Sequence, residues 1–222
     1  MRRSDYAAEA AALASALIGR ILVRELPGGE RLGGVIVETE AYLGVIDRAS
    51  HAFGGRRTAR TEPMYGQPGT SYVYFTYGMH HCFNIVCGSE GEPAVVLIRA
   101  VQPLFGAERM REHREATRAS SAKALRDVDL CSGPARLCQA MAIDLGLNRA
   151  DLTRDPRLFV CEPCENLGKK AIGRIVRTSR IGVAYAGEWA GKPLRFVLEG
   201  NPHVSVPVGR ARGTSSGAER RA

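Results

Sequence analysis

Two glutamates, Glu38 and Glu40, lie in the segment VIVETEAYLG, which otherwise has the composition of a buried strand. Ionised glutamate is costly to bury and is depleted from strands, so the pair needs a partner or a function. Because side chains alternate across a strand, we expect Val35, Val37, Thr39 and Ala41 on one face and Ile36, Glu38, Glu40 and Tyr42 on the other. The first face would join the core, and the second would form a site.

A carboxylate at such a position could act as a general base, bind a divalent metal or pair with an arginine. The two glutamates alone leave these three interpretations open. Other side chains suited to a binding site occur in and near this segment and the next β-rich one: Tyr42, His51, Tyr74, Tyr77, Asn84 and Arg99. The presence of these side chains favours a binding or catalytic site over a purely structural ion pair.

The composition is that of a basic, globular chain. With 222 residues, of which 45% are hydrophobic, it can bury a full core, and we expect one domain. Its net charge is +8, and 27 of its 31 basic residues are arginine. This balance favours a polyanionic partner such as nucleic acid. A composition bias of the source would explain the excess of arginine over lysine equally well.

No segment reaches the roughly 18 uncharged apolar residues of a membrane span, and Asp5 and Glu9 lie where a secretory signal would be free of acids. We therefore expect a cytoplasmic protein, associated with the nucleoid if it is bacterial. Such a protein needs no disulfides for its six cysteines. Cys161 and Cys164 form half of a possible zinc site, but no second close pair completes it, so we expect no metal or cofactor.

The sequence pattern predicts a mixture of helices and antiparallel strands. Helices are expected over residues 6–19 and 106–127, and a third is expected to begin at Ser132 as N-cap with Pro134 in its first turn. Two β-hairpins are expected, one with arms 21–26 and 31–44 and one with arms 71–76 and 82–86, and further strands at 93–101, 180–187 and 194–198. Residues 47–68 and 150–175 read as loops.

Five blocks of sequence carry a resemblance to a known family. They are VETEAYLG at 37–44, GTSYVYFTYGMHHCFNIV at 69–86, VLIRAVQP at 96–103, CSGPARLCQA at 131–140 and RIGVAYAGEWAGKPLRF at 180–196. Together they resemble the alkyladenine (3-methyladenine) DNA glycosylase family, in order from about residue 13 to residue 206. That family flips alkylated and deaminated purines out of duplex DNA and hydrolyses their bond to the sugar. The substrates that this resemblance implies are 3-methyladenine, 7-methylguanine and possible further bases such as hypoxanthine and ethenoadenine.

The resemblance also implies roles for residues in the first three blocks and for His51, which lies between the first and the second. Glu40 matches the general base that activates the attacking water, and Arg99 matches the residue that positions this water and a nearby phosphate. Tyr42, His51 and Tyr74 match the walls of the base pocket, where aromatic rings would stack on a flipped and often cationic purine.

Residues that would contact the DNA follow from the same resemblance. Tyr77 matches the side chain that fills the gap left by the flipped nucleotide, and Met79 beside it would widen this wedge. Asn84 matches the residue that disfavours guanine-type bases. Ser132 and Arg136 match the start of a helix that faces a DNA phosphate.

Two features of the sequence refine this picture. His80 and His81 occupy positions where relatives often carry an aromatic residue, which changes the rim of the pocket. No lysine lies in the four blocks that supply the site residues, and an enzyme that also nicks the strand usually needs an amine to form a Schiff base. We therefore expect a monofunctional glycosylase that leaves an abasic site.

The expected architecture is an α+β fold in a single domain, with a curved, mainly antiparallel β-sheet core, a protruding β-hairpin and surrounding helices. Residues 1–207 would form the glycosylase domain and 208–222 a flexible basic tail. We expect a monomer that binds double-stranded DNA containing damaged purines and has no membrane contact. Two rival functions stay open: a non-catalytic module that binds damaged DNA, and a metal-dependent nuclease in which Glu38, Glu40 and His51 hold the ion.

Overall fold

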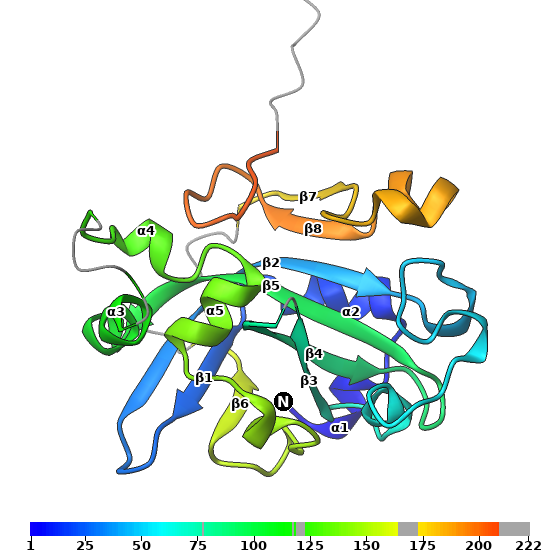
Figure 1. Cartoon of the computed structure of the whole chain (residues 1–222), viewed down its shortest axis with the longest axis horizontal. Helices are drawn as coiled ribbons and strands as arrows, with labels where there is room; N and C mark the ends of the chain where they lie inside the picture. Colours follow the sequence, from blue (N-terminus) through cyan, green and yellow to red (C-terminus); the bar gives the residue numbers. More distant parts are fainter. Residues whose placement is uncertain (77, 117, 119–122, 164–172, 209–222) are drawn as a thin grey trace, which may run out of the picture.

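The computed structural model describes residues 1–76, 78–116, 118, 123–163 and 173–208. Its centre is a curved, antiparallel sheet of eight strands in which the longest path runs β3-β4-β5-β2-β1-β6 (Figure 1). The strands are β1 Ile21–Glu25, β2 Arg31–Tyr42, β3 Ser71–Thr76, β4 His80–Cys87, β5 Ala94–Phe105, β6 Leu158–Cys161, β7 Ile175–Thr178 and β8 Arg195–Leu198. Strand β8 pairs with Glu38–Glu40 of β2, beyond the part of β2 that pairs with β1, and β7 pairs with β8.

Short helices surround this sheet. The α-helices are α1 Arg3–Tyr6, α2 Ala10–Leu17, α3 Ala107–Glu115, α4 Asp127–Leu130 and α5 Pro134–Ala140. Tight 3₁₀ turns join other elements: η1 Gly44–Ile46, η2 Phe53–Gly55, η3 Glu62–Tyr65, η4 Leu145–Leu147 and η6 Ala184–Gly191. The predicted α+β single domain with a curved antiparallel sheet is confirmed. In the described part of the chain, no helix is long and apolar enough to cross a membrane.

One continuous core holds the domain together. Leu13 and Leu17 of α2 pack with Ile36 of β2 and Ile98 of β5, and all four are almost completely buried. The same cluster extends to α5, which contributes Leu137. Since each large apolar side chain stabilises the fold by about 1.5–3 kcal/mol when fully buried, this cluster fixes α2 and α5 against the sheet.

The central strand β2 departs from the strict alternation that the sequence predicts. Ile36 pairs with Val101 and Glu38 with Ala100, so Val37 is an extra residue, and the register shifts again after Glu38. This β-bulge changes which residues share a face. Ile36 therefore lies in the main core with Ala41, while Val37 packs in a separate cluster. The prediction that Ile36 shares the face of the two glutamates is wrong because of the bulge.

The two predicted hairpins are confirmed. Strands β1 and β2 pair around the glycine turn, and β3 pairs with β4 from Ser71 opposite Ile85 to Thr76 opposite His80. Tyr77, at the predicted tip of the second hairpin, lies outside the described residues. The loop after β2 contains three of the 3₁₀ turns, and it begins where Gly44 adopts a positive φ of 69° against Pro93.

Several local predictions are wrong. The N-cap of α5 is Gly133, with a φ of 139° that favours glycine, and not Ser132. Of the described residues in the charged stretch 106–127, Ala107–Glu115 form α3 and Asp127 begins α4, so the expected single helix is not formed. Residues 180–187 form a bend and the start of η6 where a strand was expected. The predicted loop at 150–175 contains β6, which pairs with β1.

Candidate active site

A cavity of about 230 Å³ opens beside the middle of β2. This volume is roughly eight times the share of one water molecule in the liquid, which suits a planar ring system. We call it the aromatic pocket. Its walls come from β2, β3, β4, β5, the loop after β2 and the bend before η6. The lining includes Tyr42, His51, Tyr72, Tyr74, Asn84, Arg99 and Ile181.

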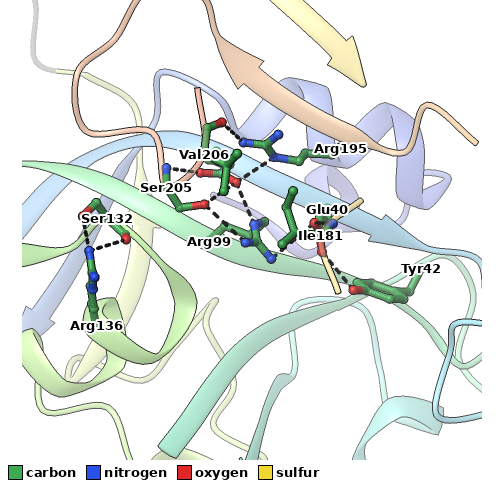
Figure 2. Close-up of polar contacts among 10 residues, drawn as sticks. Glu40, Tyr42, Arg99, Ser132, Arg136, Ile181, Arg195, Ser205 and Val206 are labelled. Carbon is green, nitrogen blue, oxygen red and sulfur yellow. Dashed lines mark hydrogen bonds and ion pairs between the residues drawn. The ribbon is translucent and has the colours of Figure 1, made fainter. Parts of the chain in front are cut away.

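Glu40 lies directly behind this lining and is fully buried. Its Oε1 accepts a hydrogen bond from the Ile181 N–H at 2.7 Å and forms an ion pair with Arg99 Nη1 at 3.2 Å, and its Oε2 accepts a hydrogen bond from the Tyr42 hydroxyl at 2.9 Å (Figure 2). All three donors belong to residues that line the pocket. The carboxylate is thus fixed at the inner end of the cavity with ordinary hydrogen-bond geometry.

Glu38, in contrast, is part of a buried ion-pair network. Its Oε1 accepts from Arg99 Nε at 2.7 Å, from Arg195 Nε at 2.8 Å and from the Ser205 hydroxyl at 2.8 Å. Its Oε2 accepts from the Ser205 N–H at 2.6 Å, and Arg195 also donates to the Val206 carbonyl (Figure 2). Burial alone would raise the pKa of the Glu38 carboxyl, but the charges of Arg99 and Arg195 and the Ser205 N–H hold it below its usual value.

Arg99 therefore joins the two glutamates. Burial would lower the pKa of its guanidinium, but Glu40 and then Glu38 raise it above the usual value, so Arg99 keeps its charge. The resemblance implied that Arg99 positions the attacking water, and the structure places its guanidinium between two carboxylates. Arg195 and Ser205 were not identified from the sequence, because their contacts with Glu38 join residues that are 157 and 167 positions apart in the chain.

A second buried ion pair anchors the other side of the pocket. Arg180 donates to both carboxylate oxygens of Asp47, at 2.5 and 2.9 Å, and to the Ala41 carbonyl at 2.9 Å. The carbon at the centre of its guanidinium lies 4.6 Å from the centroid of the Tyr42 ring. Since the next residue, Ile181, donates its N–H to Glu40, this arginine fixes two of the three groups that contact the carboxylate. The sequence offered no clear signal for it.

Aromatic rings form the opposite wall. The rings of His51 and Tyr74 meet edge to face with centroids 4.6 Å apart, and those of Tyr72 and Tyr74 lie 5.4 Å apart. The guanidinium carbon of Arg60 lies 5.1 Å from the centroid of the Tyr74 ring. Tyr72 was missed in the sequence, although its position two residues before Tyr74 places it on the same face of β3.

Protonation states in this wall are set mainly by burial. Burial, and then the charges of Arg60 and Arg56, lower the pKa of His51 to about 4, so its ring is neutral at pH 7. Nδ1 of His51 lies 2.9 Å from the Tyr72 hydroxyl. Burial raises the pKa of Tyr72 to about 12. Burial, and then the nearby Glu40 carboxylate, raise the pKa of Tyr42 well above its usual value, so Tyr42 keeps the proton that it donates to Glu40.

Asn84 and Met79 occupy different parts of the second hairpin. Asn84 is buried, lines the pocket and donates from Nδ2 to the Tyr72 carbonyl across the strand pair at 3.1 Å. The structure thus brings it to the predicted pocket and also gives it a contact within the sheet. Met79 lies in the turn between β3 and β4 and is 70% exposed. It does not line the aromatic pocket.

Ser132 and Arg136 lie together at the start of α5. Arg136 Nη1 donates to the Ser132 hydroxyl at 3.2 Å, and Pro134 between them lines the aromatic pocket (Figure 2). Ser132 itself forms a bridge to Ala100, next to Arg99. This arrangement places Arg136 close to the pocket without making it part of its lining.

The carboxylates are not grouped with other metal-binding side chains. Within the described ranges, no three His, Cys, Asp or Glu residues are close enough together to hold a metal ion. Both oxygens of Glu38 are engaged by arginine and Ser205, and His51 contacts Tyr72. Cys161 is half-buried, and Cys164, the second cysteine of the predicted zinc half-site, lies outside the described residues.

Comparison with known proteins gives this geometry a family. A model of the methylpurine-DNA glycosylase family matches residues 4–202. The chain belongs to the methylpurine-DNA glycosylase family. It is 48% identical over 199 residues to the DNA-3-methyladenine glycosylase of Homo sapiens, covering 87% of this chain and 64% of that protein. It is 47% identical over 198 residues to the Mus musculus protein of the same name, covering 89% of this chain and 58% of that protein.

Bacterial members of the family have nearly the same length as this chain. A candidate 3-methyladenine DNA glycosylase of Clostridium tetani is 44% identical over 205 residues, covering 92% of this chain and 98% of that protein. The mammalian relatives are longer, since the matched region is less than two thirds of their length. The matched region includes the aromatic pocket and both glutamates.

Proposed function

We propose that this protein is a DNA repair enzyme that releases damaged purines from duplex DNA by hydrolysing the bond between base and sugar. The observation that carries this proposal is the Glu40 carboxylate, held by Arg99, Tyr42 and the Ile181 N–H behind a pocket lined with aromatic rings. Membership of the methylpurine-DNA glycosylase family supports it. The substrate class is the purine alkylated at N3 or N7, with deaminated and etheno purines as further members.

In the proposed mechanism, Glu40 is the general base. A carboxylate has roughly four acceptor positions, and donors among the described residues fill three of them. We assign the remaining position, on Oε2, to the attacking water. The water oxygen bonds to C1′ of the sugar as the bond from C1′ to the base breaks, and Glu40 takes the proton. Its negative charge also stabilises the positive charge that develops on the sugar.

Arg99 and the aromatic wall have separate tasks. Arg99 holds Glu40 in place and presents its charge toward a phosphate beside the sugar, while Glu38 and Arg195 keep Arg99 fixed. The rings of Tyr42, His51 and Tyr74 hold the flipped base by stacking. A purine that carries a positive charge leaves as a neutral molecule and does not need a proton from an acid. His51, which is neutral at pH 7, therefore does not have to act as an acid for such a base.

The DNA contacts of this proposal lie around the pocket. Tyr77 would enter the duplex in place of the flipped nucleotide, with Met79 beside it, and Asn84 would disfavour guanine-type bases. Ser132 and Arg136 would contact the backbone. Of the described lysines, neither Lys123 nor Lys192 lines the aromatic pocket, which supports hydrolysis without strand cleavage and an abasic site as the product.

A panel of duplexes, each with one defined lesion, tests the proposed function. Free base is measured by chromatography, and strand breaks are measured before and after alkali. We expect release of 3-methyladenine and 7-methylguanine, with breaks only after alkali and unchanged activity in excess chelator. Binding without base release would instead support the non-catalytic module, and strand cleavage that chelator abolishes would support the nuclease.

A further inference from the structure

A second, larger cavity lies on the other side of the start of α5. Its volume is about 530 Å³, and it is formed by the end of α3, the segment that leads to α4, α4 itself and α5. Six charged side chains line it: Arg114, Arg118, Lys123, Arg126, Asp129 and Arg136. We call it the basic cavity. With five cationic groups and one carboxylate, it has a strong excess of positive charge.

The positive charge of the basic cavity is largely unbalanced. Among the described residues, Arg126 alone of the five has a carboxylate partner, Asp129, at 2.7 Å. Arg136 donates to Ser132, and Arg114 Nη1 donates to the carbonyls of Asp129 and Leu130. Residues 119–122, which complete the segment between Arg118 and Lys123, carry no acid in the sequence. An anion from outside the chain would supply the missing charge.

Arg114 gives the cavity a fixed inner group. It is 8% exposed, and within the described structure its Nε, which is completely buried, has no hydrogen-bond partner. A buried donor without a partner costs about 1–3 kcal/mol. Burial, and then the charges of Arg136 and Arg118, lower the pKa of Arg114, because these cations repel one another. A bound phosphate would relieve the repulsion, and its oxygens match the planar fork of arginine.

The basic cavity adjoins the aromatic pocket through two residues of one helix. Pro134 lines the pocket and Arg136 lines the cavity, so the first turn of α5 borders both. Neighbouring phosphates of one DNA strand are about 3.4 Å apart along the duplex axis, so a strand that places a base in the pocket also brings several phosphates near this turn. We propose that the basic cavity binds a backbone phosphate of the damaged strand, a few nucleotides at most from the base in the pocket, with Arg114 as its buried anchor. This proposal rests on the proposed function.

The double variant Arg118→Gln/Lys123→Gln tests the phosphate site without changing the core, since Lys123 is exposed and Arg118 only half-buried. The measurement is the affinity for a short undamaged duplex as a function of salt. Losing a phosphate contact should reduce the slope of log affinity against log salt by about 1 and weaken binding about five- to tenfold near 0.1 M salt. Arg157→Gln is the control for the general effect of charge at an exposed site; it removes one charge, from the Arg157–Asp155 pair beside β6, where the double variant removes two.

A slope equal to that of the wild type would overturn the proposal. So would an equal change in Arg157→Gln, which would indicate only a general effect of charge. Arg114→Lys, with its thermal midpoint checked, keeps the charge but removes the fork, and it should weaken duplex binding in the same direction. Undamaged DNA contains no base to excise, so the salt dependence of binding tests the phosphate site separately from the proposed glycosylase activity.

Discussion

Glu38 and Glu40 are two residues apart and equally buried, yet their partners give them different tasks. Among the described residues, Glu38 accepts from Arg99, Arg195 and Ser205, and of these three Arg99 alone lines the pocket. Glu40 accepts from three groups that line the pocket. The sequence could predict that one carboxylate pairs with arginine and that the other is a candidate base. It could not predict the Ile181 contact, because a backbone N–H leaves no signature in the side chains.

The variant Glu38→Gln should lose stability. It leaves Arg99 and Arg195 buried without their shared charge, and breaking a buried pair costs about 3–5 kcal/mol. Chemical denaturation measures the free energy of unfolding. Glu62→Gln is the control, because Glu62 forms an exposed pair with Arg57 and such pairs contribute about 0–1 kcal/mol. Similar losses in both variants would contradict the network described above.

His51 should make stability depend on pH in a defined window. Its pKa is about 4 in the folded protein and about 6.5 when unfolded, so between these values the unfolded chain binds more protons. Stability should therefore fall as the pH falls from 6.5 to 4, by a few kcal/mol in all. In His51→Gln this decline should be shallower, and denaturation at several pH values measures it. The exposed His80→Gln should follow the wild type, and an unchanged decline in His51→Gln would contradict the assignment.

At the scale of elements, strand β2 positions most of the site. The sequence predicted this strand and the two hairpins, β1–β2 and β3–β4, correctly. Alternating apolar residues and glycine turns are local signals. It did not predict the bulge at Val37, since a bulge depends on how β2 pairs with β5 and β8. The bend at residues 180–183 was also missed. RIGVAYAG has the composition of a strand, and the buried Arg180–Asp47 pair decides its conformation.

Close packing of β2 on β5 predicts the effect of Gly34→Ala. A Cβ at Gly34 would lie 2.5 Å from the backbone oxygen of Gln102, so the two strands would have to move apart. We expect a loss of about 1–3 kcal/mol in the free energy of unfolding, as for other overpacked sites. Gly191→Ala is the matched control, because a Cβ there meets nothing within 4 Å. Equal stability of the two variants would show that the strands are not held this closely.

At the scale of the whole molecule, the aromatic pocket lies between two positively charged cavities. On one side it shares Ser50, His51 and Tyr185 with a cavity lined by Arg48, Arg56 and Arg60. On the other side α5 separates it from the basic cavity. The net charge of +8 predicted a polyanionic partner, but charge alone could not show that the arginines flank one pocket. That arrangement depends on contacts between residues more than 80 apart in the chain.

Tyr77, which lies outside the described residues, is the proposed wedge. If Tyr77 fills the gap left by the flipped nucleotide, Tyr77→Ala should lose about 1–3 kcal/mol of binding to a duplex with a flipped base, on the scale of base stacking. Met79→Ala should show a smaller loss. Fluorescence anisotropy with lesion-containing and undamaged duplexes measures both. A Tyr77→Ala protein that binds the lesion duplex as tightly as the wild type would refute the wedge.

The central claim, that Glu40 is the base for the attacking water, is tested most directly by base release from Glu40→Gln under single-turnover conditions. Glutamine keeps the size of the side chain and an acceptor for the Ile181 N–H, but it takes up no proton at neutral pH. We predict that this variant binds a duplex with one 3-methyladenine or 7-methylguanine like the wild type and releases base at least about 100-fold more slowly. The exposed Glu199→Gln should release base at the wild-type rate. Release by Glu40→Gln at the wild-type rate would contradict the mechanism.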